Sequence, residues 1–118
     1  MSDADKMSIR DTVQAQLDAI KVDDAETAYH YAAPHIQKMT GTPAAFLQMV
    51  RHSYDPVYRP RAVFFQDITM MDGVPAQRVL LMDRNGSPVL AVYPMERQDD
   101  GSWRIAGCML YRGNARML

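Results

Sequence analysis

The densest group of side chains able to hold a ligand lies between residues 51 and 61. This stretch contains Arg51, His52, Tyr54, Tyr58, Arg59 and Arg61. Prolines at positions 56 and 60 stiffen it, and a guanidinium on a rigid loop can bind a carboxylate or phosphate through two parallel hydrogen bonds. The alternative is that these arginines pair with acids of neighbouring turns or cover the rim of a sheet. We expect Arg59 or Arg61 to hold an acidic group of a ligand.

Asp67 is the acid that could act as a general base, because it lies inside a predicted strand. Alternation places it on one strand face with Phe65 and Thr69, but both faces of that strand are apolar, so either could line an interior. If Asp67 points inward beside Tyr29 or Tyr93, it could move a proton in a desolvated site. If it points outward, it is a solvated residue or part of a dimer interface.

The cysteine and the histidines offer weaker sites. Cys108 could form a dyad with a distant histidine, but a lone thiol in a strand is more often a small buried hydrophobe. His30 and His35 are separated by Pro34, so one helical face cannot present both, and His52 falls on another predicted helix. A zinc site needs three or four ligands. We therefore expect no metal and no cofactor.

The first half of the chain carries the signals of helices that would position these residues. Ser8 resembles an N-cap for a first helix that runs to about residue 21 along an apolar stripe with helical spacing. A second helix ends before Pro34, because the residue preceding proline is pushed out of helical geometry. Thr42 caps a third helix, with Pro43 at its first position.

The second half predicts an antiparallel sheet. After an extended connector over residues 53–61, we expect strands at Ala62–Met71, Ala76–Met82, Val89–Arg97 and Ser102–Tyr111. Turn sequences such as Asp72-Gly73 separate them and favour a meander of hairpins. The chain is thus predicted to be one α+β domain over residues 1–118. Its parts are a flexible stretch over about 1–7, a helical part over 8–53 and a meander over 62–111, with three helices packed on a curved antiparallel sheet.

Composition limits the partners and the location. Thirteen basic and fourteen acidic residues give a net charge of −1, so no overall basic field attracts nucleic acid. The longest apolar runs are four or five residues, whereas a membrane span needs about twenty. The N-terminus is polar without a secretory pattern, and a single cysteine suits a reducing compartment. We therefore expect a cytoplasmic protein that binds neither nucleic acid nor membranes.

Four segments carry a resemblance to a known family. They are Tyr31-Ala32-Ala33-Pro34-His35-Ile36-Gln37, Thr42-Pro43-Ala44-Ala45-Phe46, the run from Tyr54 to Arg61, and the run from Asp100 to Cys108. Over roughly residues 8–111 the chain is similar to the bacterial family catalogued as domain of unknown function 4864, within the nuclear-transport-factor-2-like (SnoaL-like) superfamily. The resemblance implies a cone-shaped, cystatin-like fold, a cavity between sheet and helices, and frequent dimerisation through the sheet. It implies no activity.

Two further patterns concern the surface of the predicted sheet and the character of its cavity. The chain has ten methionines, whose flexible thioethers fill irregular cores and also line adaptable apolar cavities. The strands are apolar on both faces, so the face turned away from the helices needs a cover. In so short a chain, a second copy is the natural cover, and we expect a homodimer through the sheet.

Three hypotheses for function follow. The first is non-catalytic binding of a small, mostly apolar ligand, with contacts from Tyr29, Tyr54, Tyr58, Arg59, Arg61, Tyr93 and Cys108. The second is a small cofactor-independent isomerase or dehydratase, with Asp67 as the base and Tyr29, Tyr54 or Tyr58 as hydrogen-bond donors. The third is a protein-interaction module that uses the sheet face. An inward Asp67 with a raised pKa favours the enzyme, and a filled or absent cavity favours the interaction module.

Overall fold

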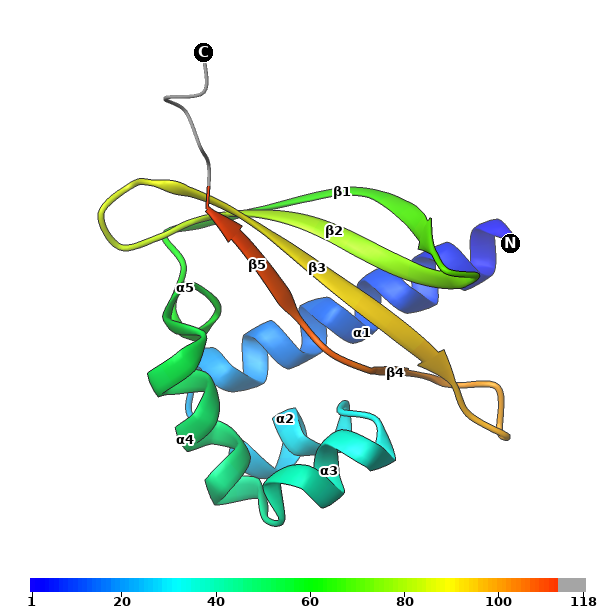
Figure 1. Ribbon diagram of the computed structural model, residues 1–118, viewed down its shortest axis with the longest axis horizontal. Helices are drawn as coiled ribbons and strands as arrows, with labels where there is room; N and C mark the ends of the chain where they lie inside the picture. The colour runs from blue at the N-terminus through cyan, green and yellow to red at the C-terminus, as the bar shows by residue number, and fades with distance from the viewer. Residues whose placement is uncertain (113–118) are drawn as a thin grey trace.

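The fold is described here for residues 1–112 from a computed structural model (Figure 1). The helices are α1 (Asp3–Lys21), α2 (Ala25–His30), α3 (Pro34–Thr40), α4 (Pro43–Ser53) and α5 (Asp55–Tyr58). The strands are β1 (Ala62–Met71), β2 (Val74–Met82), β3 (Pro88–Arg97), β4 (Trp103–Ile105) and β5 (Met109–Arg112). Helices precede strands, as expected for the α+β class.

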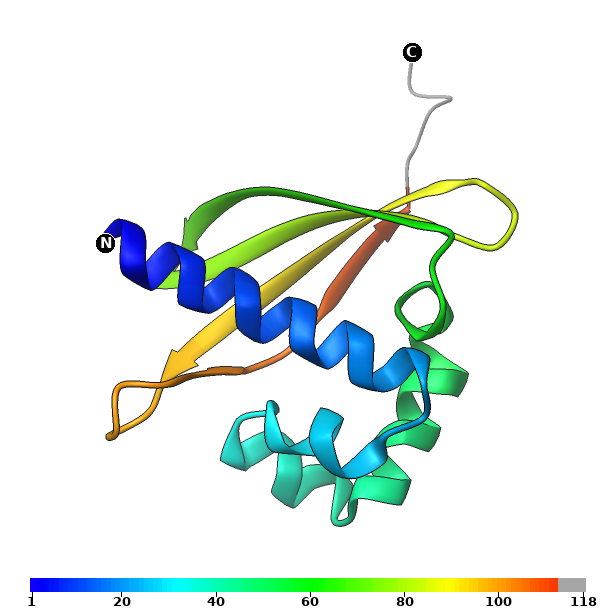
Figure 2. The same ribbon diagram turned by 180° about the vertical axis from the view of Figure 1, so that it is seen from behind.

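The five strands form one open antiparallel sheet. β1, β2 and β3 pair in sequence order, and both β4 and β5 pair with the remaining edge of β3. The two opposite views agree that the described helices lie on one side of this sheet: α1 crosses it obliquely, and α2, α3 and α4 lie beyond α1 (Figures 1 and 2). The predicted meander is confirmed, and the core lies between the sheet and the helices.

Helix α1 begins at Asp3, not at Ser8. The Ser2 hydroxyl accepts a hydrogen bond from the backbone N–H of Asp5 at 3.0 Å and so caps the helix. The segment expected to be flexible therefore supplies the first turns of α1. The apolar stripe is as predicted, since Ile9, Val13 and the later members of the stripe are buried.

Helix α2 ends at His30 because the backbone beyond it pairs with β4. The N–H of Ala33 donates to the carbonyl of Ile105, and the N–H of Ile105 donates to the carbonyl of Tyr31, both at 2.8 Å. These bonds place Ala32 against the last part of the sheet. The chain then resumes as α3 at Pro34, and the third predicted helix follows as α4, capped by Thr42 as expected.

The two prolines had predicted an extended connector over residues 53–61. The structure shows that this connector is only partly extended. Its middle forms α5, a single helical turn. Pro56 lies in the first turn of this helix, where its missing N–H has no intrahelical partner to lose. The turn buries Val57 and Tyr58 against the core.

Strand β1 contains a bulge that its sequence pattern does not reveal. Phe65 lies opposite Val79, and Ile68 lies opposite Gln77, so residues 66–67 share the place of one residue. A bulge of this kind breaks the alternation of side chains. Phe65 and Ile68 therefore both pack against the core although they are three positions apart.

The last expected strand is divided into β4 and β5. Between them the N–H of Ala106 donates to the carbonyl of Pro94 at 2.8 Å, while Pro94 has no N–H to continue the ladder. Residues 106–108 form this irregular stretch. The break brings Cys108 to the interior side of the sheet, where it packs against the core.

None of the helices within residues 1–112 is long and apolar enough to cross a membrane.

Candidate ligand-binding pocket

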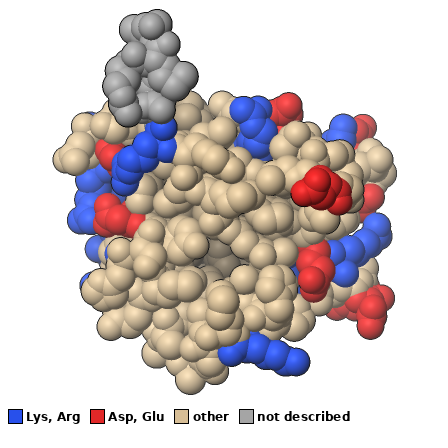
Figure 3. Space-filling model, viewed as in Figure 1, with Lys and Arg blue, Asp and Glu red and all other residues tan. Residues whose placement is uncertain are grey.

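A cavity of about 70 Å³ lies between the sheet and the helices. Four helices, β3 and the last part of the sheet contribute to it. The lining residues are Gln16, Ile20, Ala32, Ile36, Met39, Phe46, Met49, Val50, Tyr54, Val57, Tyr93, Ile105, Gly107 and Cys108. Figure 3 shows a hollow near the centre of the face seen in Figure 1, with uncharged residues around it. The cavity is therefore small, mostly apolar and placed in an uncharged part of the surface.

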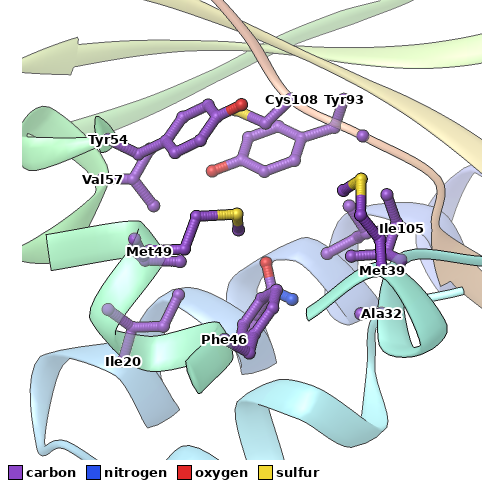
Figure 4. A pocket seen from close by; sticks show the side chains of 14 residues that line it. Ile20, Ala32, Met39, Phe46, Met49, Tyr54, Val57, Tyr93, Ile105 and Cys108 are labelled. Atoms are coloured by element: carbon purple, nitrogen blue, oxygen red, sulfur yellow. The ribbon is translucent and has the colours of Figure 1, made fainter. Parts of the chain in front are cut away.

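Tyr93 supplies the most unusual polar group of the cavity. Its side chain is 1% exposed, and its hydroxyl has no hydrogen-bond partner among residues 1–112. In Figure 4 this hydroxyl points into the cavity. Burial, with a smaller contribution from Cys108, raises the pKa of Tyr93 well above its ordinary value. The group is therefore a neutral phenol that can donate one hydrogen bond.

Tyr54 and Cys108 border the same space from opposite layers. Tyr54 ends α4, and Cys108 follows β4 in the break of the last strand (Figure 4). Burial raises the pKa of the Cys108 thiol to about 12. The thiol is therefore neutral near pH 7 and lacks the thiolate character that a nucleophile needs.

Gln16 is a polar lining residue that the sequence did not single out. It lies on the buried side of α1, and its Nε2 donates to the carbonyl of Ala28 at 3.0 Å. This bond joins α1 to α2. Gln16 is thereby a polar residue of the lining whose side-chain nitrogen is used within the fold.

Two of the expected ligand-binding tyrosines lie outside the cavity and are bonded within the fold. The Tyr29 hydroxyl donates to the carbonyl of Gln37 at 2.8 Å. The Tyr58 hydroxyl donates to Asp23 Oδ1 at 2.7 Å, and this hydrogen bond is the main reason that the pKa of Tyr58 is raised. Both hydroxyls join helical segments to one another.

The two expected arginines also lie outside the cavity. Arg59 donates to Asp23 Oδ2 at 3.0 Å and to the carbonyl of Lys21 at 3.2 Å, while its guanidinium lies over the Tyr58 ring. Arg61 is exposed just before β1. Arg59 therefore joins the end of α1 and the residues after it to the segment that follows α5. For Arg59 the structure supports the alternative reading, in which the arginine pairs with a neighbouring acid.

Asp67 points away from the cavity. It lies in the β1 bulge, its side chain is 73% exposed, and it pairs with Arg78 at 2.8 Å. It borders a separate shallow hollow between the start of α1 and β1. Alternation predicted that Asp67 and Phe65 share one face of the strand. This prediction is wrong, because the bulge between them leaves Phe65 against the core and turns Asp67 outward.

The lining that residues 1–112 supply has no side chain suited to proton transfer near pH 7. Among the described residues that line the cavity there is no Asp, Glu, His, Lys or Arg. No group of three or more His, Cys, Asp or Glu in residues 1–112 is arranged to hold a metal ion. The chemistry available at the wall is hydrogen bonding by neutral groups.

Comparison with known proteins identifies the family. The family model described as "Domain of unknown function (DUF4864)" matches residues 2–118. The chain belongs to this family. A search of curated proteins and a search of solved structures returned no match. Membership in DUF4864 carries no activity with it.

Sequence reasoning found only part of the lining of this DUF4864 pocket. Tyr54, Tyr93 and Cys108 were expected and do line it, whereas Gln16, Phe46 and Met49 were not proposed as site residues. Phe46 and Met49 lie three residues apart in α4, a spacing typical of one face of a helix. That spacing does not distinguish a side chain that fills the core from one that borders a hollow.

Proposed function

We propose that this protein binds a small, mostly apolar molecule in the cavity between the sheet and the helices. The observation that carries the proposal is the cavity itself: apolar side chains form most of its wall, and a few uncharged polar groups face it. Ligand sites commonly combine these two features. Tyr54, Tyr93 and Cys108 are the expected binding residues that the geometry supports.

Binding is favoured over acid–base catalysis by the chemistry of the wall. An isomerase or dehydratase needs a group that takes up a proton near the operating pH. Asp67 is engaged with Arg78 on the outside, and the Cys108 thiol has a pKa of about 12. With Arg59 and Arg61 also outside, residues 1–112 place no cation at the cavity wall to hold an acidic ligand group.

The proposal is tested by NMR of the full chain labelled with ¹³C at the methionine methyl groups. Met49 and Met39 line the cavity, with Met39 at its rim because that residue is 69% exposed, whereas Met70 is 61% exposed and lies on β1 outside the cavity. Added methylenecyclopentane, a small apolar probe, should shift the Met39 and Met49 signals in a saturable way and leave the Met70 signal in place.

A matched pair of variants separates cavity binding from adsorption to the surface. Figure 4 shows the Met49 side chain reaching into the cavity from α4, so Met49→Trp should fill the space and abolish the shift of Met39. Met70→Trp adds the same ring at an exposed position and should leave the titration unchanged. Equal shifts of all methionines, or no saturation, would contradict the proposal.

We also propose that the outer face of the sheet pairs with a second copy of the chain. Phe64, Leu80, Leu90 and Tyr111 form one row across four strands on that face. Phe64 and Tyr111 remain 54% and 51% exposed. Near this row Asp67 and Arg78 form a neutral pair, so the same patch on two subunits meets without net repulsion, as a two-fold interface requires.

Two broader expectations remain part of this proposal. We assign the family to the nuclear-transport-factor-2-like superfamily; helices that precede a curved antiparallel sheet and a cavity between them support this. We also keep a cytoplasmic location, which the unpaired Cys108 supports because a reducing compartment preserves such a thiol. An experimental structure and localisation of the tagged protein in its host test the two points.

A further inference from the structure

We propose that the ligand of the cavity carries an uncharged oxygen acceptor, such as a ketone or aldehyde carbonyl, that takes a hydrogen bond from the Tyr93 hydroxyl. This inference rests on the proposed function and adds the chemical class of the ligand. It also specifies what the ligand lacks, namely a carboxylate or phosphate.

The first support is the unsatisfied Tyr93 hydroxyl. A buried polar group almost always has a hydrogen-bond partner, and one without a partner calls for an explanation. The tyrosines Tyr29 and Tyr58 donate within the fold, whereas Tyr93, the most buried of the three, does not. Since the Tyr93 hydroxyl faces the cavity (Figure 4), the missing acceptor is best supplied by what occupies the cavity.

The second support is the uncharged wall. Burial opposes ionisation of Tyr93 and of Cys108 alike, so the cavity disfavours any charge that lacks an opposite charge beside it. No Lys, Arg or His among the described residues lines the cavity. A ligand carboxylate would therefore lose its hydration without gaining an ion pair, whereas a neutral carbonyl needs only one donor.

The third support is size. The cavity of about 70 Å³ is smaller than the roughly 150 Å³ engineered apolar cavity that accepts benzene. It therefore encloses a ligand portion of only a few carbon atoms, and the rest of a small ring would lie in the open hollow that Figure 3 shows. In such a space a single hydrogen bond is a large part of the recognition, because the apolar contacts are few.

The experiment compares two probes of nearly the same shape, and a third, charged probe built on the same ring, in the methionine NMR titration. Cyclopentanone carries the neutral acceptor, methylenecyclopentane replaces its oxygen by a methylene group, and cyclopentanecarboxylate carries a charge. We expect cyclopentanone to bind about tenfold more tightly than methylenecyclopentane, because only the ketone satisfies the buried donor. Cyclopentanecarboxylate should bind at least tenfold more weakly than the ketone.

The variant Tyr93→Phe removes the hydroxyl and keeps the ring. It should abolish the preference for the ketone while binding methylenecyclopentane as well as the wild-type protein does. Tyr29→Phe, which alters a hydroxyl outside the cavity, should retain the preference.

The outcomes separate the two proposals. If the ketone and the methylene compound bind equally to the wild-type protein, the inference about the ligand is overturned and the binding function stands. If the carboxylate binds as tightly as the ketone, the inference is likewise overturned. If none of the three probes moves the Met49 signal, the proposed function itself fails, and the inference fails with it.

Discussion

Tyrosine residues have different roles in this protein, depending on whether the hydroxyl group lies near a hydrogen-bond acceptor. Tyr29 and Tyr58 donate to oxygens of neighbouring helical segments and so stabilise the fold, whereas Tyr93 keeps a free hydroxyl at the wall of the cavity. A buried donor without a partner costs stability. Its retention at the cavity is therefore consistent with a role in binding.

Replacement of two tyrosines by phenylalanine should have opposite effects on stability. Tyr93→Phe removes an unsatisfied hydroxyl, so the free energy of unfolding of the ligand-free protein should rise by about 1 kcal/mol. Tyr58→Phe removes the donor to Asp23, so that free energy should fall. Urea unfolding of both variants against wild type measures the difference. A loss of stability in Tyr93→Phe as large as that in Tyr58→Phe would contradict the account.

Cys108 should make the protein less stable in alkaline solution. Its pKa is raised from 9.0 to about 12 by burial, so the folded state retains the proton after the unfolded state has lost it. The resulting contribution to stability is full below pH 9 and is lost as the pH rises from 9 toward 12. Between pH 9 and pH 10 the wild type should lose about 1 kcal/mol more than Cys108→Ala.

Urea unfolding at a series of pH values checks this difference. Cys108→Ala leaves Tyr93 buried, and burial is the main cause of its raised pKa. The comparison therefore reports the thiol together with its smaller effect on the pKa of Tyr93. Parallel stability curves for the two proteins from pH 7 to pH 10 would show that the thiol is not desolvated.

At the scale of elements, periodicity predicted which side chains of a helix or strand are buried. It predicted less well where a helix begins or where a strand is interrupted. The apolar stripe of α1 was predicted correctly, but Ser2 and Ser8 are each followed three residues later by an acid, and the sequence alone does not tell which serine is the cap. The β1 bulge and the break before β5 arise from pairing with distant strands. They decide where Asp67 and Cys108 point, so these site predictions could not be made from local patterns.

The cap of α1 can be tested with two serine substitutions. Ser2→Ala should lower the free energy of unfolding by roughly 0.5–1 kcal/mol, because the N–H of Asp5 loses its acceptor. Ser8→Ala lies inside α1 and should leave stability unchanged or raise it slightly, since alanine is the better helix former. Urea unfolding followed by circular dichroism compares them. The reverse order would place the helix start at Ser8.

The whole molecule presents two surfaces of different character. The helical side encloses the cavity, and the opposite side of the sheet exposes an apolar row with one ion pair. The sequence predicted an apolar outer face, since the strands are apolar on both faces and helices were expected on one of them, whereas the cavity was expected from the family resemblance alone. Apart from Tyr54, Tyr93 and Cys108, the lining of the cavity was not predicted, because these side chains come from segments as far apart as α1 and the end of β4.

A charge in the middle of the apolar row should prevent self-association. Leu80 lies between Phe64 and Leu90 on the outer face, so Leu80→Asp should convert a dimer into a monomer while the fold remains intact. Val22→Asp, at an exposed position after α1, is the control and should remain dimeric. Light scattering at micromolar concentration reports the mass. A wild-type protein with the mass of one chain would refute the interface.

Native mass spectrometry of the protein purified from its own host, without unfolding, tests the central claim most directly. The account predicts a dimer that carries one small neutral molecule per chain, released on unfolding, and predicts that Met49→Trp purified in the same way carries none. The same extra mass on Met49→Trp would place the molecule elsewhere. A wild-type protein without any bound molecule, together with no response to the small probes, would contradict the binding function.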